Sequence, residues 1–382
     1  MSWPVADLGS HVEILSGFAF KSDLFNNKDG LPLVRIRDVV GGISNTYYSG
    51  EHSEDYVINN GDLLIGMDGD FNREKWQGGK ALLNQRVCKI AADQKTLSQE
   101  YLYHFLPKQL KSINESTPAV TVKHLSVKDI KNIKIPLPPL PEQQRIAAIL
   151  DKADSLRRKN QQAIQLADQF LRAVFLDMFG DPVTNPKGWE LKSLKELTSK
   201  IGSGSTPRGG QNAYVEEGIS LIRSLNIHDD KFLHKNLAFI TDKQAAALSN
   251  VEVEKHDVLL NITGASVCRC AMVDNSILPA RVNQHVCIIR APELVPEYLL
   301  HMLISASYKR YLLNVAGSAG ATREALTKEQ VENLLIPVPP KSLQEKFAAI
   351  KAKVKAVVIT ENEATSLPIF DSLSQKAFVG EL

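Results

Sequence analysis

Ile135-Pro136-Leu137-Pro138-Pro139 indicates how the chain is organised, because it occurs a second time as Ile336-Pro337-Val338-Pro339-Pro340. Each copy leads into a long helical stretch. The residues behind the two copies correspond at the same offset: Gln143 and Ile146-Ala147-Ala148-Ile149 in the first, Gln344 and Phe347-Ala348-Ala349-Ile350 in the second. Solenoid repeats have periods of about 20–50 residues, far shorter than this one. The spacing therefore predicts a duplicated globular domain that is followed each time by a helix.

Further echoes lie upstream of both proline motifs. Asn84-Gln85-Arg86-Val87-Cys88 corresponds to Asn283-Gln284-His285-Val286-Cys287, and Asp62-Leu63-Leu64-Ile65 corresponds to Asp257-Val258-Leu259-Leu260. Two like domains in one chain predict a particle with pseudo-twofold symmetry. Such a particle suits a target that itself has two halves.

The composition is that of a soluble globular protein. The chain has 382 residues, of which 43% are hydrophobic and 23% charged, enough for two or three domains with cores of their own. We find no apolar run of membrane-spanning length, and the first residues do not begin a signal peptide. The cysteines at 88, 268, 270 and 287 form no framework of even spacings, which favours a reduced, cytoplasmic protein. Because the net charge is only +2, any DNA-binding face has to be a local patch.

We divide the chain into four segments: mixed domains at residues 1–140 and 183–340, and helical regions at 141–182 and 341–382. The mixed domains contain short strand-like runs separated by Gly, Asn and Asp turns. Each also has a helical stretch before its proline motif. The expected fold class is α/β, in the α+β sense, with two similar domains joined by two long helices.

The first helical region has a heptad pattern that is typical of a coiled coil. Its apolar seam advances alternately by three and four residues, through Ile146, Ile149, Ala153, Leu156, Asn160, Ala163, Ala167, Phe170 and Val174. The second region repeats the seam at Phe347, Ile350, Val354 and Val357, and Pro368 then interrupts it. We predict that the two helices pair as an antiparallel coiled coil. The alternative is that each helix packs on its own domain.

The length of the helices suggests a role as a spacer. A helix of ~38 residues is ~57 Å long, which suits two half-sites separated by about one turn of duplex, ~34–36 Å. The basic run Arg157-Arg158-Lys159 lies beside the seam, where it could meet DNA between the half-sites. The alternative for this run is a solvated helix face.

The sequence contains no motif that would make the chain an enzyme by itself. Gly202–Gly210 is rich in glycine but lacks the spacing and the lysine of a phosphate-binding loop. Cys268 and Cys270, with His285 and Cys287, could be taken for a zinc site, but their spacing fits no usual one. We therefore expect buried thiols that pack as small hydrophobic residues, and neither a metal nor a catalytic residue.

Comparison of the two halves separates shared positions from candidates for reading DNA. Residues common to both halves should serve the fold or equivalent partners, so Asn84-Gln85 and Asn283-Gln284 are interpreted as structural, although Asn and Gln can also bind adenine. Unlike polar stretches are better candidates for base and phosphate contacts. The predicted DNA-binding residues are Arg35, Asn72, Arg73, Lys75, Trp76, Lys123, Arg208, Arg223, Arg269, Arg281 and Arg323.

Different roles are expected within this set. The members between residues 72 and 76 lie in a glycine-bounded stretch that we expect to be an exposed loop with base, phosphate and aromatic contacts. Lys123 and Arg323 occupy near-equivalent loops and are expected to anchor phosphates. Arg35 and Arg223 align roughly and are expected to contact phosphate or to support the fold. For each of these residues the alternative is a solvated surface charge.

The chain resembles the specificity (S) subunits of type I restriction-modification systems along essentially its whole length. The resemblance is carried by Ile135–Arg145 with Ile146–Asp151, by Met178–Pro182, by Ala377–Leu382, and by Gly66–Asn72 and Ala81–Cys88. Each motif is weakly specific alone, but their order and duplication are highly specific.

The resemblance implies two target-recognition domains, each of which reads one half of a bipartite, asymmetric double-stranded DNA sequence. It also implies helices that pair antiparallel, act as a ruler and dock two modification (methyltransferase) subunits. S-adenosylmethionine, ATP and Mg²⁺ are then expected on partner subunits and no cofactor on this chain. A restriction (motor-nuclease) subunit stays open as a further partner. The main rival hypothesis is a protein interaction scaffold that does not read sequence.

Overall fold

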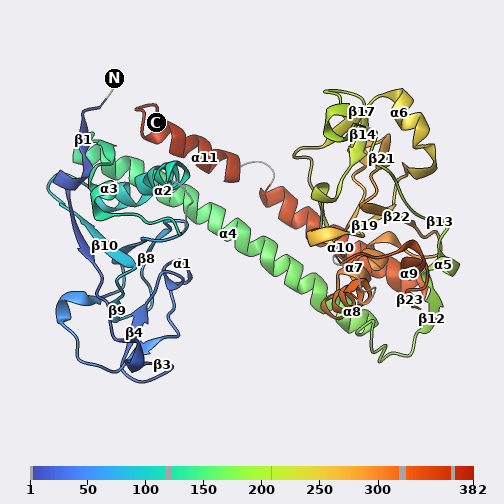
Figure 1. Cartoon of the computed structure of the whole chain (residues 1–382), viewed down its shortest axis with the longest axis horizontal. Coiled ribbons are helices and arrows are strands. Elements are labelled where there is room, and N and C mark those ends of the chain that lie inside the picture. Colours follow the sequence, from blue (N-terminus) through green and yellow to red (C-terminus); the bar gives the residue numbers. More distant parts are fainter. Residues whose placement is uncertain (1–2, 118–121, 208, 318–323, 363–365) are drawn as a thin grey trace. The chain divides into compact units, whose positions relative to one another are not determined.

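The computed structural model describes residues 3–117, 122–207, 209–317, 324–362 and 366–382 (Figure 1). The chain forms two compact units. Unit 1 comprises Met1–Gln161 and Asn362–Leu382, and unit 2 comprises Gln162–Glu361. The sequence predicts a division into consecutive segments, at 1–140, 141–182, 183–340 and 341–382. The compact units divide the chain differently, because each unit combines one mixed domain with parts of both helical regions.

The strands of unit 1 form three sheets. They are β1 (Val5–Asp7), β2 (Val12–Ser16), β3 (Phe25–Asn26), β4 (Leu31–Val34), β5 (Tyr47–Tyr48), β6 (Val57–Ile58), β7 (Leu63–Gly66), β8 (Arg73–Lys75), β9 (Ala81–Leu83), β10 (Val87–Ala92) and β11 (Lys134–Pro136). The strand orders are β2-β10-β7-β8, β3-β5-β4-β9-β6 and β1-β11. All neighbours are antiparallel except β4 and β9, which run parallel.

The strands of unit 2 repeat most of this topology, but β3 and the additional sheet β15-β16 have no counterpart in the other unit. They are β12 (Glu190–Ser193), β13 (Lys200–Ser203), β14 (Ile219–Ile222), β15 (Ile227–His228), β16 (Lys231–Phe232), β17 (Ala238–Ile240), β18 (Glu252–Val253), β19 (Val258–Asn261), β20 (Cys270–Met272), β21 (Ala280–Val282), β22 (Val286–Arg290) and β23 (Leu335–Val338). The order β13-β22-β19-β20 matches β2-β10-β7-β8, and β17-β14-β21-β18 matches β5-β4-β9-β6. Even the parallel pair recurs, as β14 with β21. The duplication predicted from the sequence is therefore present in the fold.

The helices complete both units. Those of unit 1 are α1 (Asp38–Gly41), α2 (Gln99–Ser116), α3 (Val127–Lys131) and α11 (Ser366–Ala377). Those of unit 2 are α5 (Leu194–Leu197), α6 (Asp242–Ala247), α7 (Pro296–Ile304), α8 (Ala306–Gly317), α9 (Lys328–Glu332) and α10 (Lys341–Asn362). The 40-residue helix α4 (Leu140–Phe179) contributes to both units. The predicted long first helix is thus confirmed.

Buried glutamines explain why the proline motifs recur. Gln143 and Gln344 are each 1% exposed at the start of α4 and of α10. The side-chain carbonyl of Gln143 accepts the N–H of Ser98 at 2.9 Å, and its amide donates to the Pro138 carbonyl at 2.9 Å. Gln344 repeats this arrangement with Val295 at 2.9 Å and Pro339 at 2.8 Å. The motif therefore fastens the beginning of a helix to the domain that precedes it.

Aromatic side chains fasten the ends of the helices in the same way. In unit 2 the ring of Phe179, at the end of α4, lies 4.8 Å from that of Tyr298. In unit 1 the ring of Phe378, directly after α11, lies 5.3 Å from that of Tyr101. The mixed domain of unit 1 is therefore packed against the start of α4 and the end of α11, and that of unit 2 against the start of α10 and the end of α4.

Within unit 1, α11 runs antiparallel to the first half of α4. Arg145 donates a hydrogen bond to the carbonyl of Leu382 at 2.8 Å, whereas Arg157, farther along α4, lies over the ring of Phe370 at 4.7 Å. The predicted interruption coincides with the start of a second helix, because Pro368 is the third residue of α11. Proline is tolerated in a first helical turn, where its missing N–H has no intrahelical partner to lose.

The predicted pairing residues lie in varied surroundings. Ile146 and Phe347 are fully buried in the cores of unit 1 and unit 2. Ile149, Asn160, Ile350 and Val354 are half-buried. Three residues of the expected buried seam are instead exposed: the exposed fractions of Leu156, Phe170 and Val357 are 53%, 52% and 62%. The pairing role of these residues along the whole seam stays a prediction.

Candidate DNA interface

Trp76 is not available to DNA, contrary to the expectation of an exposed aromatic residue. The side chain is 0% exposed and packs with Val34 and Leu64 in a core cluster of unit 1. Its indole N–H donates to the carbonyl of Gly79 at 2.7 Å. The chain folds back so tightly that a Cβ on Gly78 would lie 2.3 Å from the indole. The glycine-bounded stretch that was expected to be an exposed loop therefore contains a buried ring, and Gly78 makes room for it.

Arg73 and Lys75 lie on strand β8 rather than in a loop. The Arg73 guanidinium lies 3.5 Å from the centre of the Tyr103 ring, and only 13% of the side chain is exposed. Burial lowers the pKa of Arg73, although the neighbouring Tyr103 and Glu74 oppose this shift. Lys75 is paired with Glu100 at 3.1 Å. Both cations are thus held by α2, which limits their freedom to reach a duplex.

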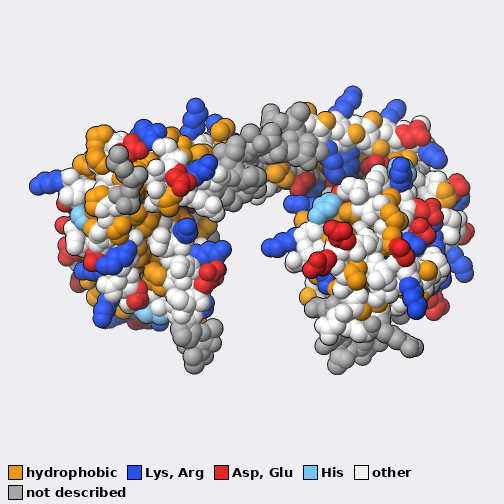
Figure 2. Space-filling model, turned by 90° about the horizontal axis from the view of Figure 1, so that it is seen from above, with side chains coloured by type: hydrophobic (Ala, Val, Ile, Leu, Met, Phe, Trp, Pro, Cys, Tyr) orange, Lys and Arg blue, Asp and Glu red, His pale blue; other side chains and the backbone are white. Residues whose placement is uncertain are grey.

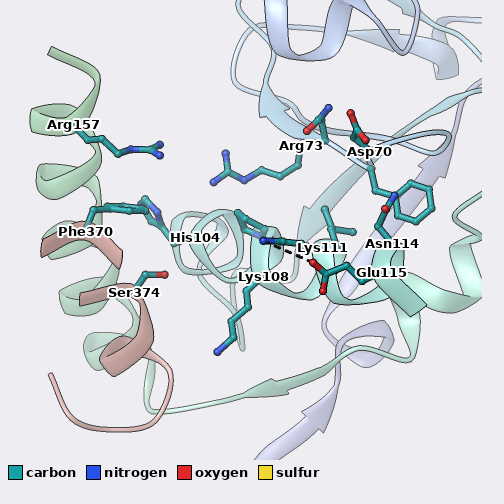
Figure 3. A pocket seen from close by; sticks show the side chains of 14 residues that line it. Asp70, Arg73, His104, Lys108, Lys111, Asn114, Glu115, Arg157, Phe370 and Ser374 are labelled. Carbon is teal, nitrogen blue, oxygen red and sulfur yellow. Dashed lines mark ion pairs between the residues drawn. The ribbon is translucent and has the colours of Figure 1, made fainter. Parts of the chain in front are cut away.

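Asn72 and Arg73 nevertheless line a polar cavity of about 540 Å³ in unit 1 (Figure 3). The exposed Asn72 precedes β8, and Arg73 extends toward Arg157 of α4, whose guanidinium points back at it. Lys108 of α2 and Phe370 of α11 also line the cavity. The structure therefore brings two predicted DNA-binding residues together and leaves Lys75 and Trp76 outside.

The basic run of α4 is largely engaged within unit 1. Arg157 and Arg158 both donate to the carboxylate of Asp154, with Nε–O distances of 3.0 and 2.8 Å. Burial opposes ionisation of Asp154, but the hydrogen bonds from both arginines outweigh it and lower the pKa of Asp154. Arg158 also reaches Glu74 at 3.2 Å and the Tyr103 hydroxyl at 2.8 Å. The run therefore holds the recognition domain on its helix.

Unit 2 contains a corresponding ionic cluster of different chemistry. Asp230 accepts a hydrogen bond from Lys351 of α10 at 2.8 Å and lies 3.5 Å from His301 of α7. Burial favours the neutral acid, but His301, Lys351 and Lys355 outweigh it and lower the pKa of Asp230 far below its ordinary value. Only 3% of the Lys351 side chain is exposed. This cluster fixes the second recognition domain to α10.

Two further predicted cations of unit 1 lie at half-buried positions. At Arg35 the backbone N–H donates to the carboxylate of Asp38 at 2.9 Å at the entry to α1. Lys123 donates to both the backbone carbonyl and the side chain of Asn114 at the end of α2. The role of the Arg35 guanidinium stays a prediction. Lys123 is tied back to α2 but stays half-buried beside the surface.

Arg281 is a second residue whose expected exposure is wrong. It is 8% exposed on β21, where it pairs with Glu252 at 3.1 Å and donates to the carbonyl of Ala245 at 3.2 Å. Arg223 is half-buried and donates to the carbonyl of Asn236 at 2.6 Å. Arg269 is half-buried before β20. Arg208 and Arg323 lie outside the described residues.

The turn at the duplicated Asn-Gln motif has a buried and an exposed member. Asn84 is 7% and Asn283 4% exposed, and the side chain of Asn283 accepts the N–H of His285 at 3.0 Å. Gln85 and Gln284, in contrast, are exposed. The asparagines thus shape the turn, in agreement with their structural interpretation.

The distribution of surface charge bears on the prediction of a local DNA-binding patch. On the face drawn in Figure 2, Lys and Arg side chains are interspersed with Asp and Glu over both units.

The four cysteines are buried, and burial raises the pKa of Cys88, Cys268 and Cys287 to about 12, so these thiols stay neutral. In the part of the chain that the structure describes, no group of His, Cys, Asp and Glu is arranged to hold a metal, and no helix is long and apolar enough to cross a membrane.

Two similar α+β domains, each fastened to long helices and each with polar side chains on its turns, define a class of duplicated recognition protein. The family model described as type I restriction modification DNA specificity domain matches residues 2–166 and again 186–366. The chain belongs to this family.

Individual relatives agree with this assignment. The chain is 33% identical over 423 residues to the type I restriction enzyme EcoBI specificity subunit of Escherichia coli, covering 100% of this chain and 86% of the relative. It is 22% identical to the MjaVIII specificity subunit of Methanocaldococcus jannaschii, covering 91% and 84%. The crystal structure of the type I restriction-modification S subunit from M. genitalium is similar with a TM-score of 0.64 at 15% identity, covering 98% and 96%. That structural likeness concerns the fold.

Sequence reasoning missed an exposed cluster formed by Asp68, Arg86 and His124. Asp68 pairs with Arg86 at 2.9 Å and with His124 at 2.7 Å. A signal was present, because Arg86 follows the shared Asn-Gln motif at a position where the second half has His285.

Proposed function

We propose that this chain is the DNA sequence-specificity subunit of a type I restriction-modification complex. In this role it binds a bipartite double-stranded DNA site and directs adenine methylation and restriction by partner subunits, without catalysing either reaction. Membership of the specificity-domain family and the similarity to named specificity subunits along the whole chain support this function. We also propose a cytoplasmic location, where the DNA substrate and the partner subunits would meet.

The observation that carries this proposal is the repetition of one scaffold with different side chains on it. Both recognition domains share a four-strand order in each of two sheets, including one parallel pair at the same place. Shared backbone geometry lets both domains approach a duplex alike, whereas unlike side chains contact different base edges. A duplicated reader with two specificities is what an asymmetric, bipartite site requires.

The proposed protein partners are two modification (methyltransferase) subunits, and a restriction (motor-nuclease) subunit in a complete system. S-adenosylmethionine, ATP and Mg²⁺ would then be bound by those subunits. Exposed apolar residues on α4 support docking of a protein: Leu166 and Phe170 are 56% and 52% exposed and lie four residues apart, on the same face of the helix.

Mapping of methylated adenines tests the proposed function. The chain is co-expressed with its modification subunit, and N6-methyladenine is mapped across the host genome with and without the gene for this chain. A bipartite motif with a fixed spacer that disappears with the gene is the expected result. A motif that survives the deletion, or no motif at all, would instead favour the interaction scaffold.

A further inference from the structure

Two turns with the same backbone hydrogen bonds carry different side chains in the two recognition domains. In unit 1 the N–H of Met67 donates to the carbonyl of Arg86 at 2.9 Å. In unit 2 the N–H of Ile262 donates to the carbonyl of His285 at 3.0 Å. The residues before Arg86 and His285 are the shared Asn-Gln pairs. Arg86 and His285 therefore occupy equivalent places on one scaffold.

A third segment completes the equivalence. The N–H of Leu125 donates to the carbonyl of Met67 at 2.7 Å, and the N–H of Leu326 donates to that of Ile262 at 2.8 Å. Isolated antiparallel bridges join the next residues in both units. This register defines four pairs of equivalent positions: Arg86 and His285, Asp68 and Thr263, Lys123 and Glu324, and His124 and Ala325.

The side chains at these positions differ in chemistry. In unit 1 the carboxylate of Asp68 holds the Arg86 guanidinium at 2.9 Å on one oxygen and the His124 ring at 2.7 Å on the other. The Arg86 and His124 side chains are 55% and 54% exposed, whereas that of Asp68 is only 17% exposed. A shielded carboxylate thus presents two exposed nitrogen-bearing side chains to the surroundings.

Unit 2 has no guanidinium at the position of Arg86 and no carboxylate at the position of Asp68. The hydroxyl of Thr263 lies 2.5 Å from Nδ1 of His285, and both side chains are half-buried. Glu324 is exposed where unit 1 has Lys123, and Ala325 replaces His124. One scaffold therefore carries a cationic fork in the first domain and a histidine held by a hydroxyl in the second.

We propose that Arg86 is a specificity-determining residue that reads a guanine in the first half-site, with Asp68 as its positioning residue. His285 takes the same place in the second domain and reads a different base. This inference rests on the proposed function. An arginine fork can donate two parallel hydrogen bonds to O6 and N7 of guanine, which no other base accepts in that geometry. A carboxylate that holds one side of the guanidinium restricts its rotation and so sharpens the selection.

The test is a methylation map of the complex of this chain with its modification subunit. Arg86→Ala should relax one guanine position of the first half-site, with a roughly 5- to 150-fold loss of discrimination, equivalent to about 1–3 kcal/mol. The second half-site and the spacer should stay unchanged. Arg86→Lys keeps the charge but loses the fork, so it should relax the same position even if Arg86→Ala fails to fold.

Further variants separate positioning from stability. Asp68→Asn should relax the same guanine position partially, while its unfolding temperature stays near that of the unaltered chain. Exchange of the pair in unit 2, by Thr263→Asp with His285→Arg, should alter only the second half-site. Lys134→Ala is the matched control, because it also removes an exposed, ion-paired cation of unit 1, bound to Asp7 at 2.7 Å, and it should leave the motif intact.

Three outcomes would overturn the inference, and they differ in what they say of the proposed function. If Arg86→Ala and Arg86→Lys methylate the unaltered motif, Arg86 is not a reader, and the function stands. A uniform loss of methylation at all sequences in Arg86→Ala, with a shallower salt dependence of DNA binding, would reveal a phosphate contact instead. If the unaltered chain directs no motif, the proposed function fails and the inference fails with it.

Discussion

The side chains of Gln143 and Gln344 perform the same task at the starts of two helices that belong to different units. Each accepts a backbone N–H of its recognition domain at 2.9 Å and donates to a proline carbonyl of the motif before it. Both are 1% exposed. The same buried glutamine contact therefore occurs twice in the fold. The repeated proline motif, the most recognisable repeat of the sequence, marks the two places where it occurs.

Removal of one of these glutamine side chains should destabilise the unit to which it belongs. Gln143→Ala leaves the Ser98 N–H and the Pro138 carbonyl buried without a partner, which should cost about 1–3 kcal/mol for each unsatisfied group. Thermal or denaturant unfolding measures this loss. The neighbouring variant Gln144→Ala is the control, because Gln144 is exposed and its loss should be nearly neutral. Equal free energies of unfolding for Gln143→Ala and Gln144→Ala would show that the buried hydrogen bonds of Gln143 do not stabilise the unit.

Trp76 should behave as a core residue. Trp76→Ala should lower the free energy of unfolding by about 3–5 kcal/mol, since the whole side chain is buried. Trp76→Phe should cost less and leave the methylated motif unchanged, because the ring does not reach the surface. A motif altered by Trp76→Phe, in a protein that unfolds at the normal temperature, would restore the discarded role in DNA reading.

Asp230 should make the stability of unit 2 depend on pH. Its pKa is lower in the folded chain than in the unfolded one, so its contribution is complete above the ordinary carboxyl pKa of about 3.9 and declines as the pH falls below that value. At pH 7, Asp230→Asn leaves Lys351 buried without its carboxylate, which should cost about 3–5 kcal/mol. The difference from the unaltered chain should shrink toward pH 3.

Unfolding temperatures measured between pH 7 and pH 3 test this prediction. Asp242→Asn is the control, because Asp242 is exposed at the start of α6. The double variant Asp230→Asn with Lys351→Met should recover part of the loss, since it removes both members of the buried pair. A gap between Asp230→Asn and the unaltered chain that stays constant with pH would rule out the carboxylate as its source.

The spacer between the half-sites should follow the length of the helices. One heptad inserted into both α4 and α10 adds ~10.5 Å of helix, which corresponds to at most about three base pairs of duplex at ~3.4 Å each. The half-sites themselves should not change, because no recognition residue is altered. Methylation mapping of the enlarged chain measures the spacer. An unchanged spacer in a folded, active variant would refute the ruler.

Part of the candidate interface could be predicted and part could not. The duplication, the long helix and the structural role of Asn84 and Asn283 follow from local sequence, because each depends on a repeated pattern or a turn. The burial of Trp76 and Arg281 could not be predicted, because both lie in polar or glycine-rich stretches that read as loops. Their surroundings come from strands distant in the chain, such as β4 near Trp76 and β18 beside Arg281.

Three properties can be read from the sequence alone: the chain contains the same domain twice, a long helix follows the first copy, and the chain belongs to the family of DNA specificity subunits. These properties depend on repeats and motifs, which can be recognised in the linear sequence without knowledge of the fold. The three-dimensional fold was needed to show which polar residues are exposed on equivalent turns. Arg86 and Asp68 meet because β7 and β10 are hydrogen-bonded neighbours, and contacts between strands distant in sequence, unlike repeats, leave no local pattern.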